Sequence, residues 1–97
     1  LHTEGPKAIA VVVDRKGSTP VKTGAIMCVN ALGQSFGTIG GGCGEHEVLR
    51  KALEVLSDKK DTFLSVDMTN DFAGEEGMVC GGTMDVIIQY VPGKVEI

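Results

Sequence analysis

The sequence predicts an α/β (α+β) domain in which a small mixed β-sheet of about five strands packs on one main helix. The chain has 97 residues, 42% of them hydrophobic and 23% charged, which is enough for one domain with a modest core. Short β-branched runs bounded by turn residues recur along most of the chain. One segment, directly after a glycine-rich loop, has helical periodicity instead. We therefore treat residues 1–97 as a single domain.

Three strands are expected in the first part of the chain, at residues 7–15, 25–30 and 35–39. The first contains the apolar run Ala8–Val13, which is typical of a strand buried on both faces. The turn residues Gly17–Pro20 end it. Residues Asn30–Gly33 predict a hairpin turn between the second and third strands.

The segment from Gly44 to about Leu56 predicts the helix. Its apolar residues recur at helical spacing and are Val48, Leu49, Ala52, Leu53, Val55 and Leu56. Glu45 and Glu47 lie in the first turn, and Lys59 and Lys60 follow the last one. Both placements suit the helix dipole, so this element is strongly indicated.

The last part of the chain predicts two further strands, at residues 62–68 and 83–91. Pro92 and Gly93 end the second of them. The stretch between them, residues 69–77, is polar and acidic and is expected to hold one turn of helix. Its neighbourhood carries the acidic residues Asp67, Asp71, Glu75 and Glu76, which are most simply a solvated face.

Composition excludes several classes of protein. The net charge is −4 and no basic run occurs, which argues against binding to nucleic acid. No apolar segment approaches the roughly 20 residues of a membrane span, and there is no signal-peptide pattern. Three cysteines cannot all pair within one chain, and an odd count without secretory features is typical of free thiols. A cytoplasmic protein is therefore expected.

The glycine-rich loop Gly40–Gly41–Gly42 precedes Cys43 and stands between a strand and the helix. That order turns backbone N–H groups toward an anion. The loop is not a P-loop, because no Lys-Ser/Thr pair follows it, and Glu45 stands where a Rossmann fingerprint needs its third glycine. A tight turn would explain one or two glycines. Three in a row before a cysteine favour a ligand site.

Two of the three cysteines adjoin glycines at junctions between elements. At Cys43 the positive end of the helix dipole favours the thiolate, and Cys80 is followed by two glycines. A disulfide, a structural metal and inert packing are the alternatives. Zinc needs closely spaced ligands that are absent here, even with His46 as a third. Soft thiolates suit molybdenum, copper or a transferable sulfur better. Cys28, inside an apolar strand, is expected in the core.

The turn Gly17–Pro20 offers two hydroxyl groups, from Ser18 and Thr19. With Lys22 two residues further on, it could hold a phosphate. Alone, such a turn is common loop chemistry.

Taken together, the motifs resemble the N-terminal domain of the xanthine dehydrogenase accessory factor family, of the XdhC and CoxI type, over residues 8–91. In order they are Gly17–Pro20, Gly24–Met27, Gly37–Cys43 with Glu45 and Glu47–Val48, and Val79–Gly82. Each motif is weak alone, but four in order are specific. Longer members carry a Rossmann-like C-terminal domain that is absent here, so a fragment or a short member is expected. Gly44 replaces a larger apolar residue, which is expected to loosen the loop.

The resemblance implies a molybdenum-cofactor chaperone rather than an enzyme. Such a protein holds the molybdopterin cofactor, assists its sulfuration by a cysteine desulfurase and delivers it to a molybdenum hydroxylase such as xanthine dehydrogenase. In that picture Cys43 and Cys80 are the metal ligands. Because the N–H groups and the dipole at a helix N-terminus attract anions, we also expect an anion pocket there for the phosphate of the pterin. The residues assigned to it are Gly40, Gly41, Gly42, Ser18 and Gly81, with Glu45 near the rim. The exposed site and short sheet suit a homodimer.

Two other functions remain open. The first is a thiol-dependent sulfurtransferase or redox protein, with Cys43 as nucleophile and Cys80 as resolving cysteine. The second is a dimerisation or docking domain that binds no cofactor and uses the acidic face around residues 71–76. Persulfide trapping at Cys43 would favour the first, and intact partner binding after serine substitution of both cysteines would favour the second.

Overall fold

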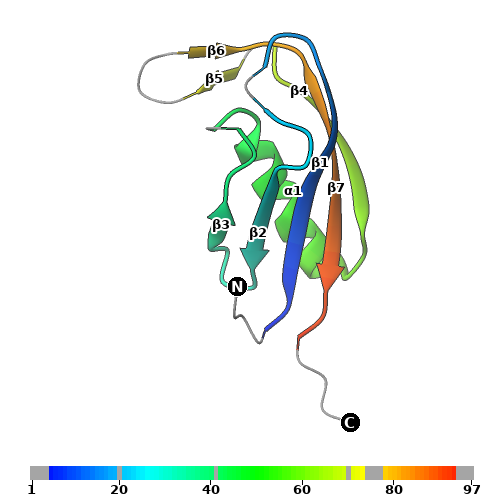
Figure 1. Ribbon diagram of the computed structural model, residues 1–97. Helices are drawn as coiled ribbons and strands as arrows, with labels where there is room; N and C mark the ends of the chain where they lie inside the picture. The colour runs from blue at the N-terminus through cyan, green and yellow to red at the C-terminus, as the bar shows by residue number, and fades with distance from the viewer. Residues whose placement is uncertain (1–4, 20, 41, 70, 74–77, 94–97) are drawn as a thin grey trace.

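A computed structural model describes residues 5–19, 21–40, 42–69, 71–73 and 78–93, the backbone alone for 71–73 and 78–80. The elements are β1 (Lys7–Lys16), β2 (Ile26–Asn30), β3 (Ser35–Gly37), α1 (Glu45–Asp58), β4 (Thr62–Asp67), β5 (Asp71–Ala73), β6 (Met78–Cys80) and β7 (Thr83–Val91). Figure 1 shows α1 lying along one face of the main sheet, and the small β5–β6 hairpin beyond one end of it. The predicted α+β fold is confirmed.

Five strands form the main sheet in the order β3-β2-β1-β7-β4. Within the described residues each neighbouring pair is antiparallel, so the prediction of a mixed sheet was wrong in that detail. Nine residues separate β1 from β2 and four separate β2 from β3, fewer than the dozen or so that a crossover between parallel strands needs. The last strand, β7, lies between β1 and β4, which places the two longest strands at the centre.

The predicted strands and helix all exist, with small shifts at their ends. β3 ends at Gly37, two residues earlier than expected, because Gly37 has a φ of 80° that breaks the extended backbone. The helical turn expected in residues 69–77 was wrong for residues 71–73. They form β5, which pairs with β6 in the register Asp71↔Cys80. Residues 74–77 lie outside the described part of the chain.

The core lies between α1 and the sheet. β1 contributes Ala8, Ala10 and Val12, and Val48 and Ala52 are buried on the facing side of the helix. Burying each valine-sized side chain stabilises the fold by about 1.5–3 kcal/mol. The expectation that β1 is buried on both faces was wrong. Its alternate residues are only half-buried, because one helix can cover only one face.

Helix α1 is bounded by two residues with left-handed backbone. Gly44, the N-cap, has a φ of 70°, and Lys59, the C-cap, has a φ of 57° and donates its N–H to the carbonyl of Val55. The predicted acidic first turn, Glu45 and Glu47, is confirmed. Among the described residues, no helix has both the length and the apolar character that crossing a membrane requires.

Candidate functional site

Gly17 and Ser18 of the first motif cross Gly81 and Gly82 of the last motif at one end of the main sheet. The N–H of Gly81 donates to the carbonyl of Ser18 over 2.9 Å. Gly82 has a φ of 82°, and a Cβ there would collide with the backbone carbonyl oxygen of Lys16. A Cβ on Gly17 would in turn lie 2.8 Å from the Cα of Gly82. Glycine is required because two backbones meet with no room for side chains.

The glycine-rich loop joins this crossing through two further contacts. A Cβ on Gly40 would lie 2.5 Å from Cγ2 of Val21, which is fully buried just after the first motif. A Cβ on Gly44 would lie 2.5 Å from Cε of Met84 and 3.3 Å from Sδ of Met68. The N–H of Met68 donates to the carbonyl of Gly82 over 2.9 Å. Motifs far apart in sequence therefore form one cluster.

Gly44 corrects one expectation about this loop. A glycine after the cysteine was expected to loosen the loop, but Gly44 is buried, and a side chain there would meet three core residues. Its φ of 70° is also unfavourable for any residue with a Cβ. Gly44 tightens the entry into α1 instead.

The carboxylate of Glu45 ties the loop to the start of α1. Its Oε1 accepts a hydrogen bond from the hydroxyl of Thr38 and another from the N–H of Ile39 over 3.1 Å. The N–H of Gly40 donates to Oγ1 of Thr38 over 3.4 Å, and that of Cys43 donates to the carbonyl of Gly40 over 3.3 Å. Glu45 therefore supplies a negative charge at the helix N-terminus, where the helix dipole favours it. Of the amides expected to face an anion, that of Gly40 is engaged within the loop instead.

Cys43 is completely buried and disulfide-bonded, directly before the N-cap of α1. Of the alternatives weighed for this residue, the disulfide is the one present, and the expectation of a free thiol was wrong for Cys43. Cys28 is a free thiol and is buried, so its predicted place in the core is confirmed. Cys80 ends β6, and its side chain lies outside the described part of the structure.

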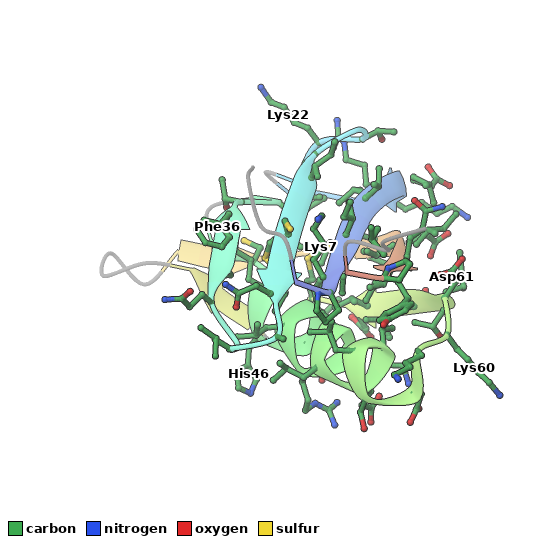
Figure 2. All side chains as sticks on the ribbon, turned by 90° about the horizontal axis from the view of Figure 1, so that it is seen from below. Lys7, Lys22, Phe36, His46, Lys60 and Asp61 are labelled. Atoms are coloured by element: carbon green, nitrogen blue, oxygen red, sulfur yellow. The ribbon has the colours of Figure 1, made fainter. Side chains whose placement is uncertain are left out.

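The other residues predicted to contact an anion lie in different surroundings. Ser18 and Gly42 are exposed, and Gly81 is half-buried in the crossing. Gly41, like Pro20 of the first motif, lies outside the described residues. Figure 2 shows Lys22 extending away from the body of the protein. The phosphate role suggested for Lys22 therefore has no contact to support it.

His46 and the acidic residues complete the survey of predicted positions. His46 is exposed at the start of α1 and points outward in Figure 2. Among the side chains that the structure describes, no three of His, Cys, Asp and Glu gather as metal ligands. Asp67, the last residue of β4, is exposed, as a solvated acid should be. Asp71, Glu75 and Glu76 have side chains outside the described part.

Asp67 has one feature that the sequence did not indicate. Its Oδ1 accepts hydrogen bonds from the hydroxyl and the N–H of Thr69, over 2.7 and 3.0 Å. These bonds favour the charged carboxylate and hold the pKa of Asp67 below its ordinary value. The turn leads from β4 into Met68, so it helps to set the edge of the motif cluster.

A polar hollow at the far end of α1 was not predicted. It is lined by Lys51, Glu54, Val55, Asp58 and Asp61, among others. Lys51 and Glu54 form an ion pair of 2.9 Å, which lowers the pKa of Glu54. Lys60 and Asp61 mark this region in Figure 2, away from His46 at the other end of the helix. The hollow does not touch the motif cluster.

Comparison with known proteins agrees with the motifs. The sequence profile of the XdhC and CoxI family matches residues 1–67. The uncharacterized protein YqeB of Escherichia coli (strain K12) is 41% identical over 83 residues, which are 86% of this chain and 15% of YqeB.

A solved structure also matches. It is described as a xanthine dehydrogenase from Bacillus halodurans and superimposes with a TM-score of 0.75 at 28% identity, over 92% of this chain and 27% of that one. The chain thus spans less than a third of the length of either relative. The profile match, the identity to YqeB and the shared fold together show that this chain belongs to the XdhC and CoxI family.

Proposed function

We propose that this chain is the cofactor-binding part of a molybdenum-cofactor chaperone that serves a molybdenum hydroxylase of the xanthine dehydrogenase type. The observation that carries the proposal is the meeting of the first, third and last motifs at one end of the sheet. Membership of the XdhC and CoxI family supports it. So does the solved relative, which is itself described as a xanthine dehydrogenase.

The cysteine sulfurs can serve as ligands of a molybdenum cofactor only when the disulfide of the chain is reduced. A cysteine sulfur is the soft ligand that suits molybdenum, but Cys43 is buried and disulfide-bonded. A dithiol reductant would exchange with this disulfide, becoming a disulfide itself and leaving Cys43 as a thiol. Cys80 is the proposed second ligand. The bound group would supply the metal centre on which the hydroxylase depends.

The phosphate of the pterin is proposed to lie against the glycine-rich loop, with Ser18 and Gly81 beside it. Glu45 limits how it can bind, because its carboxylate already holds the N–H of Ile39 and would repel a second anion placed there. The amides of Gly41 and Gly42 are therefore the proposed contacts. In this arrangement Glu45 positions the loop rather than contacting the phosphate.

The proposed partners follow from this role. A cysteine desulfurase would supply sulfur to the held cofactor, and a hydroxylase would receive it. Both encounters belong to the cytoplasm, the proposed location. The chain is not proposed to catalyse a reaction of its own.

Anaerobic loading with released molybdenum cofactor tests this function. The reduced chain would be incubated with the cofactor, separated by gel filtration and analysed for molybdenum. We expect near-stoichiometric metal in the reduced protein and little in the oxidised one. Loss in both Cys43→Ser and Cys80→Ser, with retention in Cys28→Ala, would establish the two ligands. An unloaded, folded wild type would overturn the proposal and favour a docking domain.

The disulfide at Cys43 favours a second candidate, a sulfurtransferase. The Cys43 thiolate would attack the outer sulfur of a persulfide donor, and the S–S bond of the donor would break to release its thiolate. Attack of Cys80 on the inner sulfur of the new persulfide would then expel hydrosulfide and form a disulfide. Mass spectrometry of the reduced chain after incubation with a persulfide donor tests this step. An added sulfur atom on Cys43 of Cys80→Ser, where the persulfide cannot be resolved, and its absence in Cys43→Ser are the expected results.

A further inference from the structure

The disulfide of Cys43 links the start of α1 to a second cysteine. The sequence has three cysteines, and Cys28 is a free thiol. Cys43 is disulfide-bonded. Within one chain, Cys80 is the cysteine that remains to pair with it. Such a bond would join the residue directly before the N-cap of α1 to the last residue of β6.

Contacts in the motif cluster bring these two positions into one region. Gly44 directly follows Cys43, and a Cβ on it would lie 3.3 Å from Sδ of Met68. The N–H of Met68 donates to the carbonyl of Gly82 over 2.9 Å, and Gly82 follows Cys80 by two residues. The Cα atoms of a disulfide lie about 5.5–6 Å apart. Because both cysteines border the same contacts, the fold suits this pairing.

The β5–β6 hairpin has few other attachments to the body of the protein. Within the described residues β5 and β6 pack on each other, and neither packs extensively on another helix or strand. Figure 1 shows the hairpin beyond one end of the main sheet. Two hydrogen bonds lie at its base, from Gly81 to Ser18 and from Met68 to Gly82. A disulfide at Cys80 would therefore be the main link between the hairpin and the start of α1.

We propose that Cys43 and Cys80 form a redox switch that links the β5–β6 hairpin to the start of α1 and controls the cofactor site. In the disulfide neither sulfur is a thiolate, and the thiolate is the form of cysteine that binds a metal. Reduction breaks the link and makes both sulfurs available. Control of the cofactor site rests on the proposed function, whereas the disulfide and its reduction do not.

Burial determines which sulfur a reductant attacks. Cys43 has no exposed surface, so the thiolate of a dithiol reductant has to attack the sulfur of Cys80. The S–S bond of the chain breaks, and Cys43 leaves as a thiolate that takes up a proton. The second thiol of the reductant then attacks the reductant sulfur of the mixed disulfide and releases Cys80. The reductant becomes a disulfide, and two electrons and two protons have passed to the chain.

Peptide mapping of the chain after equilibration with oxidised glutathione tests the pairing. Free thiols are alkylated in denaturant before digestion. We expect Cys28 to be alkylated and a peptide containing Cys43 to be linked to one containing Cys80, in a chain that runs as a monomer on a non-reducing gel. Cys28→Ala is the matched control and should keep the link. A link between Cys43 and Cys28, or alkylation of all three cysteines, would overturn the proposal.

Brief exposure of the oxidised chain to reduced glutathione, stopped with acid, tests the order of attack. We expect the mixed disulfide with glutathione on Cys80, because the sulfur of Cys43 is sealed from solvent. Glutathione on Cys43 instead would contradict this order.

Equilibration in buffers of increasing reduced to oxidised glutathione tests the switch without the cofactor. We expect a single transition from disulfide to dithiol within the range of these buffers. Hydrogen exchange at the amides of β5 and β6 should be faster in the reduced chain, whereas exchange in β1 should not change. A disulfide that persists at every ratio would be structural and would overturn the proposal. Equal exchange in the two states would show that the disulfide does not hold the hairpin.

Repeating this titration with released molybdenum cofactor tests the control of the site. A cofactor that binds only the dithiol form, at about ten times its Kd, should shift the midpoint roughly tenfold toward more oxidising buffers. Bound molybdenum with an unchanged midpoint would show that the disulfide does not control the site. A reduced chain that binds no molybdenum would overturn the proposed function, and the cofactor-free titration would still decide whether the switch exists.

Discussion

The two faces of the five-stranded sheet are both apolar, yet they differ in the size of their residues and in what covers them. On the face that α1 covers, the small residues Ala8 and Ala10 lie among the buried side chains of Val12, Val86 and Ile88, and the larger Leu64 and Tyr90 are half-buried. The face opposite α1 has Ile26, Phe36 and Phe63, each more than a third exposed. Small residues let the helix approach the sheet closely. Large apolar side chains that remain exposed are removed from water, which is favourable, only when another molecule covers them. One face therefore supplies stability, and the other keeps large apolar side chains in contact with water.

Adjacent isoleucines on β7 offer the strongest test of this difference. Ile88 is fully buried under α1, and Ile87 is 38% exposed on the opposite face. We expect Ile88→Ala to reduce the free energy of unfolding by about 3 kcal/mol, through lost burial and a cavity. Ile87→Ala should cost about 1 kcal/mol, because much of that side chain stays in water. Urea denaturation of both variants at a concentration that keeps the chain monomeric would measure this. Equal losses would contradict the comparison.

The glycine that begins α1 gives the next largest effect. Gly44→Ala should lower the free energy of unfolding by about 2 kcal/mol, from left-handed backbone and from overpacking against Met84 and Met68. Gly33→Ala is the control, because Gly33 has a similar φ of 81° but no atom within 4 Å of an added Cβ. It should cost about 1 kcal/mol from backbone strain alone. If the two variants were equally stable, the tight packing at Gly44 would be disproved.

A smaller effect is expected where the helix is tied to the glycine-rich loop. Glu45→Gln should lower the free energy of unfolding by about 1 kcal/mol, since a charged acceptor is lost from Thr38 and Ile39. It should also speed hydrogen exchange at the N–H of Ile39. Glu47→Gln, on an exposed residue paired with Arg50, should change stability by less than about 0.5 kcal/mol. Unchanged exchange at Ile39 would show that Glu45 does not hold the loop.

The smallest effect concerns acid stability at Asp67. Because its pKa is lowered in the folded chain, the carboxylate contributes stability above its ordinary unfolded pKa, and this contribution is lost as the pH falls through the folded value. Thr69→Val removes the hydroxyl donor and should raise the pKa of Asp67 toward its ordinary value. NMR titration of the side-chain carboxyl would follow this. Thr23→Val, at an exposed turn before β2, should leave the titration of Asp67 unchanged.

The sequence by itself determined the local elements and the family. The β-branched runs predicted the strands of the main sheet, and 3.6-residue periodicity with acidic residues in the first turn predicted α1. Cys28 inside an apolar strand was correctly placed in the core. Four motifs in order indicated the XdhC and CoxI family, which the comparisons confirm. These features depend on neighbouring residues or on residue order, so a single chain is enough to predict them.

Only the tertiary structure determined which of these elements contact one another. It placed β7 beside β1, covered one face with α1, and formed the β5–β6 hairpin where one turn of helix was expected. It buried Cys43 in a disulfide and turned Glu45 back onto the loop. The backbone crossing at Gly82 joins segments more than sixty positions apart. These contacts form only when distant segments of the chain come together and the helix packs on one face of the sheet. Local periodicity and motif spacing do not determine which distant segments meet or which face is covered.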